Sequence, residues 1–191
     1  MSTTDLLTEL TLDEKISLLA GESVWGLKGV ARVGLAPIRV MDGPVGVRST
    51  PSAQGGTAGP STNFPAVVCM SASLRPDLME AVGRALGCEI RAKGFHVLLA
   101  PCINLHRVPI GGRNFESFSE DPYWTISMAI PYINGVQREG IGTSLKHFAV
   151  NNQEHERMTI SAEVDERTLR EVYLSTFEQV IKGDNPWTVM G

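Results

Sequence analysis

The sequence contains few cysteines and no long apolar run, and each shortage excludes a class of protein. Three cysteines, Cys69, Cys88 and Cys102, are an odd number without CxxC spacing. They indicate neither a disulfide framework nor a cysteine zinc site, and we interpret them as small buried apolar residues. No run approaches the ~20 apolar residues that cross a bilayer, so no membrane partner is predicted. Residues Met1 to Asp5 lack the cationic and apolar regions of a signal peptide, which favours a cytoplasmic location.

Positive charge and nucleotide motifs are also scarce. Lysine and arginine number 17 against 21 acidic residues, a net charge of −4, so the sequence predicts no nucleic-acid partner. The sequence has no GxGxxG motif after a strand and no GxxxxGK[ST] motif, which argues against a nucleotide cofactor. It also lacks the GxSxG motif of serine hydrolases. His147 and His155 are eight residues apart rather than at helical i, i+4 spacing, so we predict no metal and no cofactor. A metal-dependent hydrolase is kept as an alternative function, and metal found in the protein by elemental analysis would support it.

Hydrophobic residues make up 42% of the 191 residues, enough for the core of one domain spanning residues 1–191. Apolar spacing predicts three helices: residues 11–21, which open on a Thr11–Glu14 capping box, 73–93 and 165–182. A fourth helical pattern over residues 126–136 contains Pro131, so we expect a bend there or a helix that begins later. Short apolar strands are predicted near residues 38, 97, 143 and 187, the third running to Val150.

Alternating helices and buried strands predict an α/β fold with a parallel sheet. A closed (β/α)8 barrel needs about 250 residues, and only four strands are predicted here. We therefore expect a partial (β/α)8 TIM-barrel-like domain, an incomplete barrel. The last strand would have an unpaired edge, through which copies of the chain could self-associate.

Polar side chains follow three of the predicted strands, at the sheet edge where parallel α/β folds bind ligands. Asp42 follows the first strand, Arg113 and Glu116 lie in the loop after the second, and Lys146, His147 and Arg157 lie at or after the third. Carboxylates that accept from hydroxyls, beside cations that donate, suit a small polyhydroxylated ligand such as a sugar.

Simpler explanations compete for several of these residues. The whole role of Asp42 could be to form an Asx turn before Gly43. Arg113 and Glu116 could be a surface ion pair, and residues 154–157 could be a solvated turn. A surface position is a weaker explanation for Lys146, within a strand that should be buried. Because neighbouring strand residues point to opposite faces, Lys146 and His147 need a bulge, a strand end or an unusual peptide to face one ligand.

Five motifs in order resemble the N-terminal domain of glycoside hydrolase family 3 β-glucosidases. The resemblance extends over essentially the whole chain, and the motifs are TLDEKISLLAG (11–21), VMDGPVG (40–46), APCINLHRVPIGGRNFESFSEDP (100–122), SLKHFAVNNQEHERM (144–158) and VDERTLREVYL (164–174). The resemblance implies a TIM-barrel-like domain of an enzyme that removes terminal β-linked glucose with retention. It assigns substrate-binding roles in the −1 subsite to Asp42, Arg113, Lys146, His147 and Arg157, with Glu116 supporting Arg113.

The resemblance also implies that both catalytic carboxyl groups lie beyond Gly191. In the family, the nucleophile is the Asp of a later Ser-Asp-Trp motif and the acid/base Glu comes from the following domain. We therefore expect a truncated domain that binds glucose or a β-glucoside but does not hydrolyse it alone. The alternative is a non-catalytic sugar-binding or regulatory module that pairs with another chain.

Overall fold

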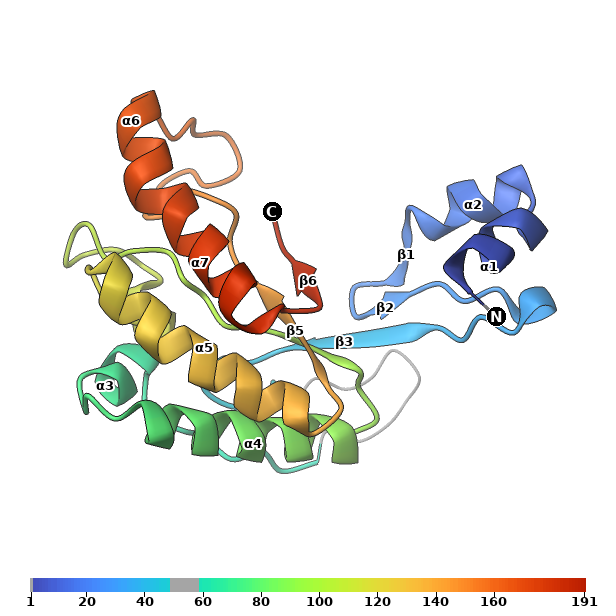
Figure 1. Ribbon diagram of the computed structural model, residues 1–191, viewed down its shortest axis with the longest axis horizontal. Coiled ribbons are helices and arrows are strands. Elements are labelled where there is room, and N and C mark those ends of the chain that lie inside the picture. The colour runs from blue at the N-terminus through green and yellow to red at the C-terminus, as the bar shows by residue number, and fades with distance from the viewer. Residues whose placement is uncertain (1, 49–58) are drawn as a thin grey trace.

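An open sheet runs through the computed structural model, which describes residues 2–48 and 59–191 (Figure 1). The strands β3 to β6 are parallel, whereas β1, β2 and β3 pair antiparallel. In spatial order the strands are β1 (Gly21–Ser23), β2 (Gly26–Leu27), β3 (Ile38–Asp42), β4 (Val97–Leu99), β5 (Gly142–Leu145) and β6 (Thr188–Val189).

The four parallel strands are those predicted from the sequence. Val40 pairs with Val97, and Leu98 with Thr143, which places the strands side by side in chain order. Leu98 and Leu145 are fully buried because side chains cover both faces of the sheet. The sheet does not close on itself, so the prediction of an incomplete α/β barrel is confirmed. The short antiparallel strands β1 and β2 were not predicted.

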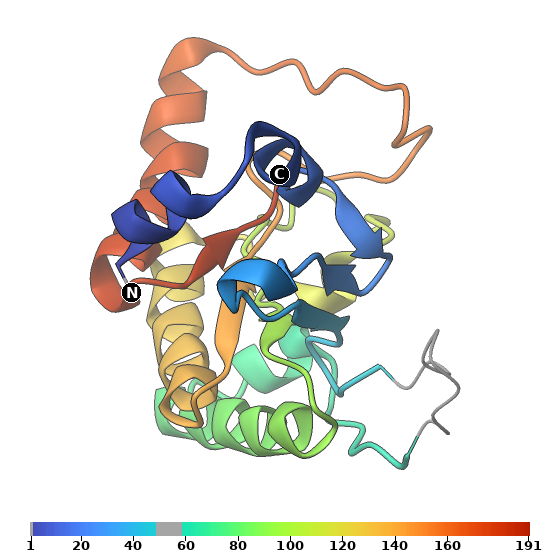
Figure 2. The same ribbon diagram turned by 90° about the vertical axis from the view of Figure 1, so that its right-hand side faces the viewer.

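Three long helices form a layer along one side of the sheet (Figures 1 and 2). They supply much of the buried apolar core, including Met79, Leu86, Ile133 and Phe177. The helices after β3 are α3 (Val67–Ser71), α4 (Pro76–Ala92), α5 (Pro122–Arg138), α6 (Glu166–Thr168) and α7 (Ser175–Asp184), with a π-helical segment, Leu169–Leu174, joining the last two.

Two glycines allow α4 and α5 to cross in close contact. A Cβ on Gly83 would lie 2.3 Å from the Tyr132 carbonyl oxygen, and a Cβ on Gly135 would lie 2.2 Å from the Glu80 carbonyl oxygen. Pro131 lies inside α5, which begins at Pro122. Of the two alternatives expected at Pro131, a bend or a later helix start, the later start is excluded, because Asp121 caps α5 and Pro122 fits the first helical position, where no amide partner is needed.

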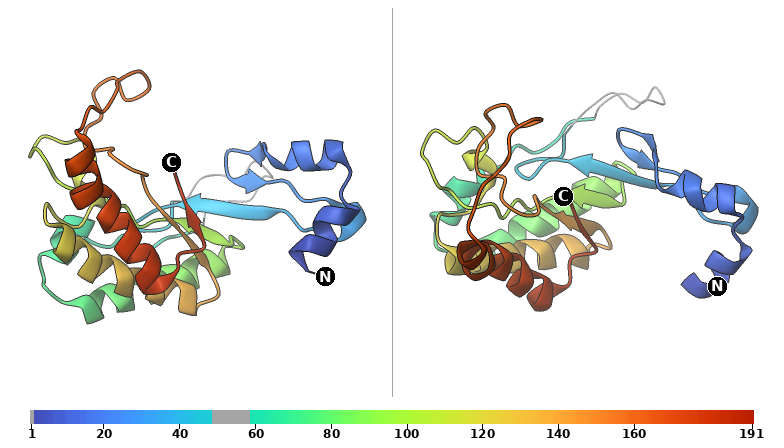
Figure 3. Two further views of the ribbon diagram at one scale, coloured as in Figure 1. Left: turned by 45° about the horizontal axis from the view of Figure 1, so that its top comes forward. Right: turned by 90° about the horizontal axis from the view of Figure 1, so that it is seen from above.

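The N-terminal helices α1 (Thr3–Glu9) and α2 (Leu12–Leu18) lie apart from this layer, at the far end of β3 (Figure 3). The capping box between Thr11 and Glu14 is confirmed. The helix ends at Leu18 rather than at Gly21, because Gly21 begins β1. The sequence reasoning missed α1, which contains no buried residue.

Two further expectations were wrong in detail. Cys69 and Cys88 are exposed, and only Cys102 is buried among the three cysteines. The C-terminal helix extends past Lys182, because Gly183 continues α7 and Asn185 closes it in the left-handed conformation. Among residues 2–48 and 59–191, no helix is long and apolar enough to cross a membrane.

Candidate functional site

The ends of β3, β4 and β5 bring most of the predicted site residues together. Asp42 is the last residue of β3, and Lys146 and His147 follow directly after β5. Arg113 and Glu116 lie at a short 3-10 turn, Asn114–Glu116, in the long loop after β4. Because these parallel strands are neighbours, their following segments meet at one edge of the sheet.

The amino group of Lys146 links two carboxylates. Its Nζ donates to Asp42 Oδ1 at 2.9 Å and lies 3.3 Å from Glu116 Oε2. Only 2% of Lys146 is exposed, so a surface explanation for this lysine is wrong. A buried ammonium needs such partners, because an unpaired charge in the interior is strongly destabilising. Asp42 is therefore more than a turn-forming residue.

Glu116 also holds Arg113. Arg113 Nε donates to Glu116 Oε1, and the Glu116 side chain is 4% exposed. The predicted ion pair is present, but it is largely buried rather than on the surface. Arg113 Nη2 lies 2.9 Å from His147 Nε2, which extends the network from Asp42 through Lys146 and Glu116 to the imidazole.

His147 is neutral in this environment. Burial, followed by the charges of Arg113 and Lys146, lowers the pKa of His147 from 6.5 to about 3. Its Nδ1 lies 3.1 Å from Asn104 Oδ1, an acceptor, so we assign the proton to Nδ1. The Nε2 lone pair then accepts the hydrogen bond from Arg113.

Asn104 fixes the backbone around His147, and sequence reasoning did not single it out. Its Oδ1 accepts from the His147 amide at 3.0 Å, and its Nδ2 donates to the His147 carbonyl at 2.9 Å and the Ala149 carbonyl at 3.2 Å. Asn104 is only 4% exposed. Its place in a polar run just after β4 was the available signal.

Lys146 and His147 both enter the network, although they are adjacent. The strand β5 ends at Leu145, before both residues, so the expectation of a strand reaching Val150 was wrong. A cis peptide bond joins Lys146 to His147. The strand end is one of the features predicted to allow both side chains to face one ligand.

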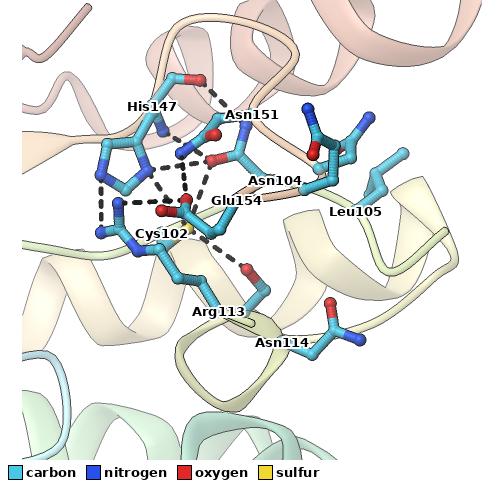
Figure 4. A pocket seen from close by; sticks show the side chains of 11 residues that line it. Cys102, Asn104, Leu105, Arg113, Asn114, His147, Asn151 and Glu154 are labelled. Carbon is cyan, nitrogen blue, oxygen red and sulfur yellow. Dashed lines mark hydrogen bonds and ion pairs between the residues drawn. The ribbon is translucent and has the colours of Figure 1, made fainter. Parts of the chain in front are cut away.

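Among the described residues, Arg157 is linked by ion pairs to the other predicted site residues only through the Glu154 carboxylate. Its Nη1 lies 3.2 Å from Glu154 Oε2, and Glu154 Oε1 lies 3.7 Å from Arg113 Nη1. Figure 4 shows Glu154 beside Arg113 and His147, where these residues line a small hollow. The turn is exposed from His155 onward, but Glu154 is half-buried and was missed. No group of three or more potential ligands able to hold a metal occurs in the described ranges, 2–48 and 59–191.

Comparison with known proteins gives consistent matches. The model of the "Glycosyl hydrolase family 3 N terminal domain" matches residues 47–191. A β-glucosidase of Rhizobium radiobacter is 47% identical over 93% of the chain and 22% of its own length. An exo-α-(1→6)-L-arabinopyranosidase of Bifidobacterium longum is 42% identical over 99% of the chain and 26% of its own length.

Solved structures agree with the sequence matches. The structure of β-glucosidase 3B from Thermotoga neapolitana in complex with glucose superposes with a TM-score of 0.92 at 39% identity. The match covers 97% of this chain and 28% of that one. The chain thus spans about a quarter of the length of the curated relatives it matches.

Proposed function

Because this chain belongs to glycosyl hydrolase family 3, a family of glycosidases, we propose that it binds the terminal glucosyl unit of a β-glucoside, or glucose itself. The observation that carries the proposal is Lys146, buried between Asp42 and Glu116 beside the Arg113–His147 pair. These groups alternate acceptors and donors over a short distance, as the recognition of neighbouring sugar hydroxyls requires.

Each residue that was predicted to bind the sugar has a defined role in this proposal. Asp42 shares one carboxylate oxygen with Lys146, and its side chain is 30% exposed, so the carboxylate can also accept from sugar hydroxyls. Arg113 and Arg157 have side chains 26% and 57% exposed and donate to hydroxyl oxygens. His147 is neutral, and its Nε2 can accept from a sugar hydroxyl in exchange for the hydrogen bond from Arg113. Glu116 supports Lys146 and Arg113.

We further propose that the 191 residues bind the sugar without cleaving it. Retaining hydrolysis uses two carboxyl groups about 5 Å apart, one as nucleophile and one as acid/base. Asp42, Glu116 and Glu154 are each engaged with a cation in the network. No Ser-Asp-Trp segment occurs in the sequence, which supports the proposal that the nucleophile is not among these 191 residues.

Calorimetric titration with glucose tests the binding proposal. We expect saturable binding that Asp42→Asn weakens at least tenfold, because the variant loses a charge-assisted acceptor and leaves Lys146 less well paired. Asp13→Asn, an exposed position with the same charge change, is the matched control and should bind as the unchanged chain does. Equal binding by the Asp42→Asn variant would contradict the proposed site. L-Arabinose, titrated in parallel, decides whether the sugar resembles that of the Bifidobacterium relative.

An aryl β-glucoside assay tests the second part. The purified 191-residue chain should release no aglycone above the uncatalysed rate. Release with retained anomeric configuration would show that the chain contains its own catalytic carboxyl pair.

The exposed end of the sheet favours a second candidate function, a sugar-binding module that pairs with a copy of itself. No described strand lies beyond β6, and Trp187 and Val189 are 59% and 45% exposed there. A homodimer in analytical ultracentrifugation, together with saturable glucose binding, would support this candidate. A monomer at all concentrations would exclude it.

A further inference from the structure

Glu154 is in contact with two of the arginines that the proposed function assigns to the sugar. Its Oε2 accepts from Arg157 Nη1 at 3.2 Å, and its Oε1 lies 3.7 Å from Arg113 Nη1. The two arginines belong to different loops, one after β4 and one after β5. Glu154 is therefore a second charged contact between these loops, beside the Lys146–Glu116 pair.

The turn itself holds Glu154 in place. Asn151 Nδ2 donates to Glu154 Oε1 at 3.2 Å. The stem of the glutamate packs on the glycine turn before Arg113, since a Cβ on Gly112 would lie 3.5 Å from Glu154 Cβ. Its side chain is only 20% exposed, so water screens the carboxylate less than it would at the surface.

The charges of the site balance only when Glu154 is counted. Lys146, Arg113 and Arg157 are three cations, and Asp42, Glu116 and Glu154 are the three carboxylates in contact with them. His147 adds none. Without Glu154 the two guanidinium groups would repel each other, and Arg157 would lose the ion pair that restrains its long side chain.

We propose that Glu154 is a positioning residue that holds Arg157 and Arg113 in the orientation in which they bind the sugar. This proposal rests on the proposed function. Glu154 acts through the arginines, so its removal weakens binding without removing a direct contact to the ligand. The negative charge of its carboxylate, rather than the shape of the side chain alone, orients the two arginines.

Glucose titration of Glu154→Gln tests the proposal. This variant keeps the size of the side chain and removes the charge, and we expect glucose to bind about tenfold more weakly. Glu156→Gln, two residues away and exposed, changes the net charge equally and should leave the affinity unchanged. Unchanged affinity in Glu154→Gln, or an equal loss in both variants, would overturn the proposal.

A double-mutant comparison separates positioning from general damage. Adding Glu154→Gln to Arg157→Gln should cause much less loss of affinity than it does in the unchanged chain, because the arginine on which it acts is gone. The same fold-loss in both backgrounds would show that Glu154 does not act through Arg157.

Arginine side-chain NMR of the sugar-free protein provides a readout independent of binding. In the unchanged chain the Arg157 guanidinium signal should be shifted from the position typical of free arginine. Glu154→Gln should move it back, and Glu156→Gln should not. An unmoved signal would refute the role of Glu154, whereas absence of glucose binding in the unchanged chain would refute the proposed function and leave this readout to decide on Glu154.

Discussion

Lys146 lies at the centre of the buried charge network, where we expect it to support both the stability of the site and the proposed binding of sugar. Lys146→Met keeps the apolar stem and removes the ammonium, which leaves Asp42 and Glu116 without their shared cation. We expect a loss of glucose binding and a decrease of about 3 kcal/mol in the free energy of unfolding, measured with urea.

The matched control is Lys182→Met on α7. Lys182 pairs with Glu178, but both side chains are largely exposed. Exposed pairs contribute about 0.5 kcal/mol or less, so this variant should unfold close to the unchanged chain. Equal stability of the two variants would show that the buried network around Lys146 is not stabilising.

The imidazole of His147 makes stability depend on pH. Burial and the neighbouring cations lower its pKa from 6.5 to about 3, so between these values the unfolded chain binds a proton that the folded chain does not. The free energy of unfolding therefore falls as the pH drops from 6.5 toward about 3. Below the lower value both states are protonated and the contribution is lost.

Asp184 opposes this effect. Burial raises its pKa from 3.8 to about 6, so the folded chain gains stability as the pH falls through that interval. We therefore expect His147→Gln, introduced into an Asp184→Asn background, to flatten the pH dependence of unfolding below 6.5. Urea denaturation at a series of pH values measures it, and identical slopes with and without His147 would contradict the assignment of a neutral imidazole.

The residues of the site were predictable to different extents. Lys146 and His147 stand out because polar groups within a short apolar strand have few explanations other than a site, whereas Asp42 could also have been only a turn-forming residue. Glu154 and Asn104 lie in polar runs where every residue type is expected, so their contacts depend on how distant loops fold together. Sequence spacing does not reveal such contacts.

The elements that face the core were predictable for a similar reason. The helix α4 and the strand β4 carry apolar residues in helical spacing or in one run, and burial enforces those patterns. The helix α1 depends instead on the Ser2 cap and buries nothing, so no apolar pattern marks it. Pro131 misled the prediction because proline disfavours helix interiors, yet α5 is packed between α4 and α7 and tolerates it.

The crossing of α4 and α5 provides a test of helix packing. Glycine to alanine normally stabilises a helix interior by about 1 kcal/mol. Gly135→Ala should instead lower the free energy of unfolding by about 2 kcal/mol, because the new Cβ meets the backbone of α4 at Glu80.

Gly183→Ala in α7 is the comparison for this change, since its Cβ would meet only the movable end of the Ile130 side chain. Thermal or urea unfolding of both variants measures the difference. A Gly135→Ala variant that is more stable than the unchanged chain would contradict the close helix crossing.

The molecule as a whole presents one exposed flank at β6, and a lysine there should prevent association. Val189→Lys places a charge beside the unpaired edge, where it would oppose pairing with a second chain. Sedimentation should show the variant as a monomer at concentrations where the unchanged chain is a dimer. The control is Val24→Lys, at a more exposed apolar position next to β1. Loss of the dimer in both variants would locate the contact elsewhere.

The hairpin formed by β1 and β2 occupies the outer edge of the first parallel strand, β3. On the side of β3, β2 is already paired through Leu27 and Ile38, and it runs the opposite way. A strand parallel to β3 can therefore pair at its outer edge only after β2 has left, whereas beside Thr188 and Val189 no described strand lies in the way. Two copies therefore cannot pair their β3 strands directly unless the hairpin first detaches from both.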